Sequence, residues 1–597
     1  MENNLCLLTK VNNLMKKLKL RAVIFIFCCI SIGLQSQTNF KWNHFDNDIF
    51  KRAKKENKLV LLHLRANWCH WCHVMEEKTY ADKAVQNYLI ANYIPCMEDH
   101  DERPDLTSLY NDYGWPATII FDADGNELFK QAGYIPADEF LETLGKLKKN
   151  PKRLESDFVE TGTKTQSDTA KQSALNFLQT RFRQSLDIEL GGFVFGQKYV
   201  EFDTFEYAFE HAPKDSSLKQ WVKASMVNSS GLYDKVWGGI FQYSTDNDWE
   251  HIHYEKLLFI QARYIKMYCW YYNIYHDVTA LQRAEGVSNY VSRFLASPQG
   301  GFYNAQDADL IKGEKAIEYY KLNNEERLKK GIPAIDSSVY SSDNAQYAEA
   351  LLVLWGTSNN QKYLTQALKC IDFIIEKRKS NTTFMHGNHY AATTSLKDNL
   401  SVLKTLMLAY RATQNQLYKM EAKDLVKNIV TKFHSDKGYL YTYIGNSAIK
   451  ATYNISENID ACRLLNYASY CFEEPLYKTE ANSILNFLID SKVLKTISTE
   501  PGILTAAEEL KTEPTVAALM IKNGEDFKLD YLQTTVSYPH FYFNSHVYTK
   551  DNIIKDKQDL FEAFDTNFMI LCTSTYCSSP LLSFKDFKDF LYKRALN

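Results

Sequence analysis

The sequence has little net charge, little proline and little glycine. Its 69 basic and 72 acidic residues leave a formal net charge of −3 over 597 residues. That balance offers no electrostatic footprint for nucleic acid or for an anionic membrane surface, so we exclude both as partners. Only 13 prolines and 23 glycines interrupt the chain, whereas 39 tyrosines and 34 phenylalanines enrich it. This composition favours helices with aromatic faces over disorder, and the length predicts two or more domains.

The apolar run near the N-terminus is too short for a comfortable membrane span, which needs about 20 residues. From Met15 the chain reads MKKLKLR, then AVIFIFCCISIGL, then QSQ. A basic cap, an apolar run and a small residue near Ser36 are typical of a secretory signal peptide. We predict a signal peptide over residues 1–37, with a true start at Met15; an uncleaved anchor is the alternative. Both the signal peptide and the anchor predict an exported protein, periplasmic or extracellular. The signal peptide also predicts no membrane contact after it is cleaved.

Cysteine is also sparse. Of the 12 cysteines, Cys6, Cys28 and Cys29 fall within the predicted signal segment, which leaves nine. Close pairs occur only at Cys69/Cys72 and Cys572/Cys577. An odd number in an exported chain argues against a full disulfide framework and for a few specialised thiols.

The segment WCHWCH at residues 68–73 packs two cysteines and two histidines into five positions. Three kinds of chemistry fit this spacing. Cys-x-x-Cys at a helix start is a redox dithiol, Cys-x-x-Cys-His is the attachment signal for c-type haem, and mixed cysteine and histidine can bind zinc. The surroundings must decide among them.

The surroundings resemble thioredoxin over residues 40–150. An apolar strand at 58–66 leads into the motif and a helical pattern follows it over 73–88. A proline stands at the mouth of a later strand, where a cis peptide bond is at home. The remaining elements are expected as a strand at 93–97, a helix at 106–113, strands at 117–122 and 126–131 joined by a hairpin turn, and a helix at 137–148. This order favours a dithiol over haem or zinc, because haem needs a second ligand and an apolar slot and zinc needs a tetrahedral cage. We predict no cofactor and no metal.

Position assigns the roles within this site. Cys69, at the helix start, is the expected attacking thiol, since the helix terminus favours a thiolate, and Cys72 is the expected resolving thiol. His70 is expected to stabilise the thiolate and to make the pair more oxidising. Trp115 and Pro116 are expected to lie against Cys69.

His63 occupies the place where thioredoxins keep a buried acid. It is either a proton relay or a core histidine.

Longer motifs resemble one family, the spermatogenesis-associated protein 20-like family. They are CHWCHVMEEKTYADKAVQNYL, DHDERPD (99–105), YGWPATIIFD, GLYDKVWGGIFQYSTD (231–246), HYEKLL (253–258), GGFYNAQDAD (300–309) and CTSTYCSSP (572–580). The resemblance implies a thioredoxin-like domain followed by an α/α toroid like those of sugar epimerases and glycosidases. The chain departs from the family pattern at 241–244, at Val200 and at Asp343-Asn344. These are polar cavity-type positions, so the departures count against catalysis in the ring.

The rest of the chain agrees with a ring of helical hairpins. Apolar helices recur with short turns, often containing Asn, and with "YL" or "LY" opening the next helix, as expected of a solenoid or closed ring. We predict a linker over 151–172, the toroid over 173–514 and a small α+β tail over 515–597. In the tail, the runs at 527–538 and 540–549 look strand-like. Cys572 and Cys577 are expected to form a local disulfide or to exchange with the dithiol.

Polar residues concentrate at two places in the expected ring, and they are His251, His253, Glu255, Asp307 and Asp309. A carboxylate pair across a cavity could act as acid and base on a sugar-like ligand. The alternative is capping and buried hydrogen bonding. The sequence therefore predicts an exported thiol–disulfide oxidoreductase with a protein dithiol or disulfide partner. Two alternatives stay open: a carbohydrate-active toroid with an accessory redox domain, and a non-catalytic scaffold.

Overall fold

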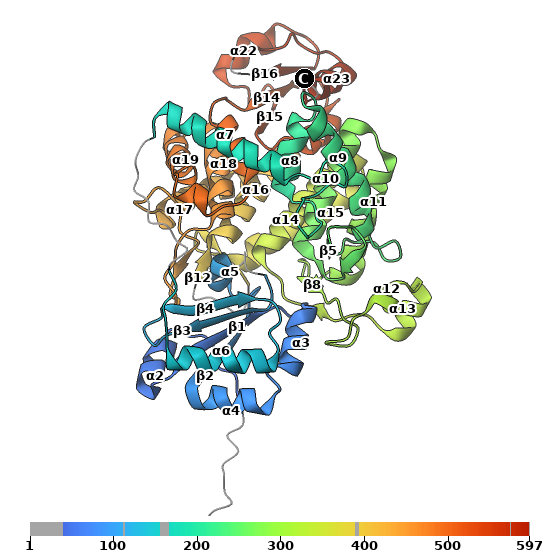
Figure 1. The fold of residues 1–597 in the computed structure, drawn as a ribbon. Helices are drawn as coiled ribbons and strands as arrows, with labels where there is room; N and C mark the ends of the chain where they lie inside the picture. The colour runs from blue at the N-terminus through green and yellow to red at the C-terminus, as the bar shows by residue number, and fades with distance from the viewer. Residues whose placement is uncertain (1–39, 111–113, 156–165, 388–392, 574, 596–597) are drawn as a thin grey trace, which may run out of the picture.

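The computed structural model describes residues 40–110, 114–155, 166–387, 393–573 and 575–595. The predicted signal segment and much of the predicted linker lie outside this range. Three layers stack along the long axis of the molecule (Figure 1): a thioredoxin-like domain in blue, a ring of helices in the middle and a small α+β tail in red. The predicted fold class, a thioredoxin-like α/β domain followed by an α/α toroid with a β-containing tail, is confirmed.

The thioredoxin-like domain has a four-stranded sheet in the order β2-β1-β3-β4. Strand β1 pairs in parallel with β2 and antiparallel with β3. Every residue of β3 is buried, as expected for a strand covered on both faces. The elements are α2 (Ile49–Glu56), β1 (Leu59–Arg65), α3 (His70–Lys78), α4 (Lys83–Asn92), β2 (Tyr93–Asp99), α5 (Pro104–Tyr110), β3 (Ala117–Phe121), β4 (Glu127–Ala132) and α6 (Ala137–Lys149).

The single helix expected over 73–88 is in fact two helices. Helix α3 ends at Lys78, and α4 begins after Asp82, whose carboxylate accepts the backbone N–H groups of Ala84 and Val85 at 2.8 and 3.0 Å. An aspartate in this position satisfies the free N–H groups of a new helix and so favours a restart over a continuous helix. The short α3 that results carries the whole cysteine and histidine motif.

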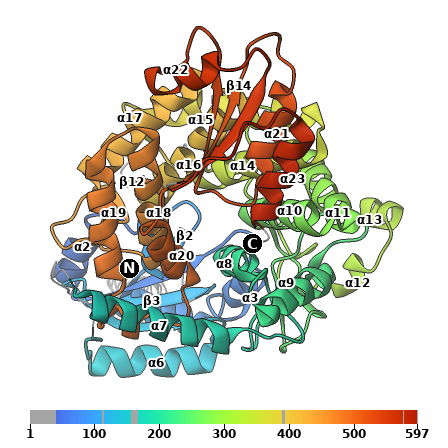
Figure 2. The same ribbon diagram turned by 90° about the horizontal axis from the view of Figure 1, so that it is seen from above.

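The ring consists of inner and outer helices, seen end-on in Figure 2. Among the described residues the inner helices contact one another in the closed order α8–α10–α14–α16–α18–α20–α8, and each packs mainly against one outer helix. The inner helices are α8 (Phe202–His211), α10 (Leu258–Tyr275), α14 (Ser341–Ser358), α16 (Leu396–Thr413), α18 (Ile455–Cys471) and α20 (Pro501–Glu509). The outer helices are α7 (Asp168–Ser185), α9 (Ser216–Asn228), α11 (Val278–Tyr290), α15 (Gln361–Arg378), α17 (Gln416–Lys432) and α19 (Pro475–Leu488).

The short turns noticed in the sequence close three of these hairpins in the same way. His276, Asn359 and Gln414 end inner helices with φ of 56°, 59° and 58°. The next residue in each case caps the outer helix with its side chain: Asp277, Asn360 and Asn415. A left-handed residue followed directly by an Asx cap reverses the chain within two residues, so consecutive helices pack antiparallel.

The tail covers the end of the ring opposite the thioredoxin-like domain (Figure 1). Its sheet has the order β15-β14-β16, and its helix α21 contacts α10, α14 and α16. The strand expected at 527–538 is wrong, because residues Lys528–Ser537 form α21 and bury one continuous run against the ring. The elements are β14 (Thr515–Met520), α21 (Lys528–Ser537), β15 (Phe543–Tyr548), α22 (Lys555–Glu562), β16 (Phe568–Cys572) and α23 (Phe584–Ala595).

No helix in the described part of the chain is long and apolar enough to cross a membrane.

A buried arginine links three inner helices where the ring closes. Arg463 on α18 lies 2.6 Å from a carboxylate oxygen of Glu206 on α8 and 2.9 Å from one of Glu509 on α20. All three side chains are buried. Removing one partner of a buried ion pair leaves an uncompensated charge in a medium of low polarity.

We therefore expect Arg463→Met to destabilise the protein by about 3 kcal/mol or more. Chemical denaturation followed by circular dichroism measures the loss. Lys585→Met is the matched control, since it breaks the fully exposed pair with Asp589 and should leave the midpoint unchanged. An Arg463→Met midpoint equal to that of the control would contradict the assigned role in ring closure.

Candidate functional site

The two cysteines of the motif lie at the first turn of α3. Cys69 is the N-cap residue of this helix and Cys72 lies one turn further on; the two are joined by a disulfide with a Cα–Cα distance of 5.3 Å. The Cys69 sulfur accepts the backbone N–H of Cys72 at 3.2 Å. Free N–H groups and the helix dipole favour negative charge at this position, so a reduced Cys69 gains stabilisation as a thiolate. Cys69 is 4% exposed and Cys72 is fully buried.

The Trp115–Pro116 segment lies beside the dithiol. Its peptide bond is cis, and Trp115 belongs to the same apolar cluster as Cys69 and Cys72. The Trp115 ring stacks on His100 with centroids 4.0 Å apart. The same cluster includes Leu257 and Ala305 from the ring, so side chains of the second domain cover the face on which the dithiol lies.

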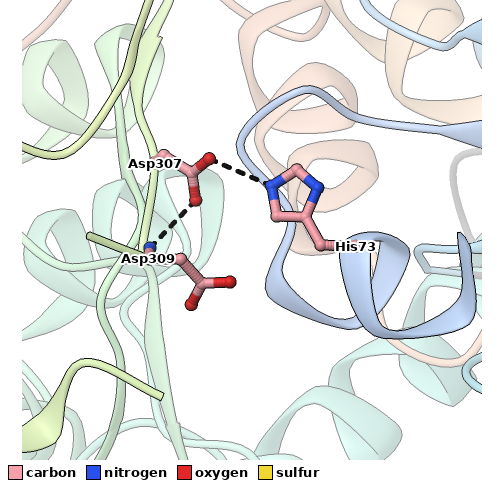
Figure 3. Close-up of side chains that lie close together, drawn as sticks. All are labelled: His73, Asp307 and Asp309. Carbon is pink, nitrogen blue, oxygen red and sulfur yellow. Dashed lines mark hydrogen bonds and ion pairs between the residues drawn. The ribbon is translucent and has the colours of Figure 1, made fainter. Parts of the chain in front are cut away.

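The two histidines of the motif reach across to the ring. Nδ1 of His70 lies 2.8 Å from a carboxylate oxygen of Asp309, and Nε2 of His73 lies 3.0 Å from one of Asp307. Figure 3 shows His73 projecting from α3 toward Asp307, whose second oxygen accepts the N–H of Asp309. All four side chains are buried. The histidines of the motif therefore join the two domains, which accounts for their presence beside a dithiol.

His73, Asp307 and Asp309 are also the described residues that could hold a metal ion together. One ligand atom from each lies within 4.8 Å of the others. In the structure these atoms already take part in hydrogen bonds, and Asp309 also accepts the N–H of Gly313 at 2.9 Å.

The DHDERPD segment forms a second part of the interface. Asp101 accepts the indole N–H of Trp68 at 2.7 Å and the amide N–H of Asn304, a ring residue, at 2.8 Å. Its backbone carbonyl lies 2.5 Å from Nε2 of His386, whose other nitrogen faces Asp398 at 2.9 Å. Asp101 thus fixes the tryptophan that precedes Cys69 to the ring.

A cavity of about 320 Å³ lies where the two domains meet. The thioredoxin-like domain contributes Trp68, Cys69, Trp71, His100, Gly114 and Trp115. The ring contributes aromatic side chains and a few charged ones, among them Glu201, His253, Glu255 and Arg263. A cavity of this size, lined by aromatic side chains and several polar ones, suits a small molecule.

Glu255 lines the cavity together with Cys69. The backbone N–H of His70, the residue that follows Cys69, is close enough to act on its carboxyl group. The side chain is 4% exposed, and its Oε2 has no hydrogen-bond partner among the described residues. Burial, with a smaller effect of the charges on Asp307 and Asp309, raises the pKa of Glu255 to about 8. Glu255 is therefore mostly protonated at neutral pH and can exchange a proton close to it.

The three other histidines singled out in the sequence lie in different surroundings. His253 lines the cavity and stacks on Tyr243 at 4.2 Å, and burial lowers its pKa to about 4. His251 does not reach the cavity, because it is exposed and pairs with Asp248 at 2.7 Å in a surface hairpin. His63 is fully buried between Trp42 and Tyr80, and burial lowers its pKa.

Asp307 and Asp309 also lie elsewhere than the ring-catalysis hypothesis requires. They do not line the cavity; they face the histidines of α3. The ring-catalysis hypothesis considers the ring alone. The thioredoxin-like domain places two buried histidines next to these aspartates, and a buried histidine is an available partner for an aspartate.

The remaining cysteine pair is remote from this site. Cys572, at the end of β16, is disulfide-bonded to Cys577. The free cysteines among the described residues are Cys96, Cys269, Cys370, Cys462 and Cys471. Burial raises the pKa of each of these thiols, so they are poor nucleophiles at neutral pH.

Three residues at the site carry no recognisable signal in the sequence. Asp101 lay within a motif that carried the family resemblance but had no assigned role. Glu201 caps α8 by accepting the N–H of Thr204 at 2.7 Å, and an acid one residue before an apolar helix is a signal for a cap rather than a site. Arg263 lies within α10, and nothing in its neighbours distinguishes it.

The expected family resemblance is confirmed by comparison with known proteins. A family model described as "Thioredox_DsbH: Protein of unknown function, DUF255" matches residues 32–174. Spermatogenesis-associated protein 20 of Mus musculus is 31% identical over 306 residues, which cover 45% of this chain and 38% of that protein. The Homo sapiens protein of that name is 28% identical over 305 residues, covering 39% of its length. The chain therefore matches less than half the length of these relatives.

Two other kinds of protein are similar to parts of the chain. The thiol:disulfide interchange protein DsbD of Colwellia psychrerythraea is 35% identical over 99 residues, 16% of each chain. Among solved structures, cellobiose 2-epimerase from Bacillus thermoamylovorans is 14% identical and covers 54% of this chain and 87% of its own, with a TM-score of 0.43. A sugar epimerase from a ruminal bacterium is 15% identical, covers 54% and 86%, and has a TM-score of 0.44.

Proposed function

We propose that this chain is an exported thiol–disulfide oxidoreductase that works at the cavity between its two domains. The observation that carries the proposal is the dithiol at the N-terminus of α3, with Cys69 on the wall of that cavity. A helix N-terminus stabilises the attacking thiolate, and a second cysteine one turn away is placed to release the product. Export rests on the signal segment expected over residues 1–37.

The proposed reaction is a two-step exchange. The Cys69 thiolate attacks a substrate disulfide, forms a mixed disulfide and releases one substrate thiolate, which takes up a proton. Cys72 then loses its proton, attacks the Cys69 sulfur and releases the second thiolate. Two electrons pass from the dithiol to the substrate, and the Cys69–Cys72 bond forms. A substrate dithiol drives the same steps in reverse.

We assign Glu255 the proton transfer. The Glu255 pKa of about 8 is close to the ordinary pKa of a thiol, about 8.5. A proton then passes between Cys72 and Glu255 at little cost in either direction, which is the best condition for general acid–base catalysis. His63 has less support as a relay, since it lies among aromatic rings.

We assign His70 a role in the domain interface. Its Nδ1 lies 2.8 Å from a carboxylate oxygen of Asp309, so the second domain holds its ring. The effect expected of His70 on the Cys69 thiolate stays a prediction, and the free N–H groups of the helix terminus support the thiolate independently.

Carbohydrate chemistry in the ring has less support. Asp307 and Asp309, the carboxylates that such chemistry would need, pair with His73 and His70. We therefore propose no second function.

The test uses the full chain with only the Cys69–Cys72 bond reduced, the Cys572–Cys577 bond verified as intact by peptide mass spectrometry, and the reductant removed. The reagent is a chromogenic aromatic disulfide. The protein should release two equivalents of aromatic thiolate and end with the Cys69–Cys72 bond, identified by peptide mass spectrometry. A reduced protein that releases no thiolate would overturn the proposal.

A further inference from the structure

We infer that the substrate of the dithiol is a small amino-acid-type thiol or disulfide, carrying a carboxylate and an ammonium group, rather than a disulfide in a folded or extended protein. This inference rests on the proposed exchange function and adds the substrate class. Three features of the cavity carry it: the side chains that cover Cys69, the guanidinium of Arg263, and the carboxyl group of Glu201.

The cover argues against a protein substrate. A polypeptide that docks on a thioredoxin-like domain needs an open face around the attacking sulfur. Here Leu257 and Ala305 of the ring pack against the cysteines, and Cys69 is 4% exposed. The histidine–aspartate pairs and Asp101 hold this cover in place. What remains next to Cys69 is a cavity of about 320 Å³, enough for a molecule of small-peptide size.

Arg263 supplies the site for a carboxylate. Its guanidinium lies over the Phe259 ring at 5.1 Å, and both residues line the cavity. Among the described residues no hydrogen bond or close ion pair of the Arg263 side chain is found, and its charge acts on Glu201 and Asp460 at longer range. A stacked guanidinium with free N–H groups is suited to bind a carboxylate through two parallel hydrogen bonds. Beside a redox dithiol, such a group favours a thiol compound that carries a carboxylate over a neutral thiol compound.

Glu201 supplies an acidic group on the same cavity, and one of its oxygens accepts the N–H of Thr204 at 2.7 Å. Burial, with a smaller effect of the charge on Asp203, raises the pKa of Glu201 to about 7, so an ammonium group beside it would favour its ionised form. An ammonium group beside Glu201 and a carboxylate on Arg263 would leave no net charge in the cavity. The amides of Gln197 and Gln242 and the hydroxyls of Tyr199 and Tyr243 line the same wall and add hydrogen-bonding groups for a polar backbone.

The experiment compares three substrates of the reduced full-length protein: glutathione disulfide, the neutral bis(2-hydroxyethyl) disulfide and insulin. We expect the highest kcat/KM for glutathione disulfide and the lowest for insulin. Arg263→Met keeps the packing on Phe259 and removes the charge, so it should lower kcat/KM for glutathione disulfide by about tenfold to a hundredfold. It should leave the neutral disulfide nearly unchanged.

Arg181→Met is the matched control. Arg181 also lies over a phenylalanine, Phe177, at 5.3 Å, but on the outer helix α7 and away from the cavity. This variant should behave as the wild type toward all three substrates. Insulin reduced as fast as glutathione disulfide, or an equal effect of Arg263→Met on both small disulfides, would overturn the inference while leaving the exchange function intact. No exchange with any of the three would instead overturn the proposed function.

Discussion

Replacing Cys69 by serine should abolish exchange, and replacing Cys72 by serine should leave a protein that reacts once and remains attached to its substrate. In the wild type, Cys69 makes the first bond and Cys72 breaks it. With a chromogenic disulfide, the reduced Cys72→Ser protein should release one equivalent of thiolate and gain the mass of the other half. The Cys69→Ser protein should release none, because Cys72 is fully buried.

The other cysteines provide the control. A Cys572→Ser/Cys577→Ser protein lacks the second disulfide and should still release two equivalents of thiolate in that assay. The five free cysteines are buried or partly buried with raised pKa values, so they should not contribute on the same timescale. Equal release from the wild type and Cys69→Ser would show that the reactive thiol lies elsewhere. Release of two equivalents by Cys72→Ser would rule out its role as the resolving thiol.

The sequence predicted the thioredoxin-like domain and the helix pairs because their signals are local. A buried strand before a Cys-x-x-Cys, a proline before the next strand, and apolar helices closed by Asx turns each depend on a few adjacent residues. The failures also have local causes. The helix break at 79–82 depends on a cap at Asp82, and α21 was mistaken for a strand because a short apolar run fits both states.

The site was only half predictable, because half of it comes from the other domain. His70 and Asp309 are 239 positions apart, and His73 and Asp307 are 234 apart. No pattern within the motif indicates such partners. The motif alone fits haem attachment, zinc binding or a charge beside the thiolate. In the structure its two histidines instead hold the ring against the dithiol. The same contact brings Glu255 to the backbone of His70.

Replacing Glu255 by glutamine should slow the resolving step by about a hundredfold and change its pH dependence. Glutamine has nearly the shape of protonated glutamate, but it cannot take up a proton. In the wild type the release of the second thiolate should rise with pH through the Glu255 pKa of about 8, since only the ionised carboxylate accepts a proton. The groups that face Glu255 are Asp307, Asp309, Tyr243, Tyr320 and the backbone of His70.

A stability measurement distinguishes a slower resolving step in Glu255→Gln from misfolding of the variant. A carboxyl group whose pKa is higher in the folded state than in the unfolded state stabilises the fold below the unfolded value, and that contribution is lost as the pH rises through the folded value. For Glu255 the window runs from the ordinary glutamate pKa of 4.5 to the raised pKa of about 8. Above this window Glu255→Gln should therefore be more stable than the wild type in thermal unfolding, although it exchanges more slowly. If the variant instead kept the wild-type rate and the rise near pH 8, Cys72 would pass its proton directly to water, and the contribution of the ring to the chemistry would be limited to enclosing the dithiol.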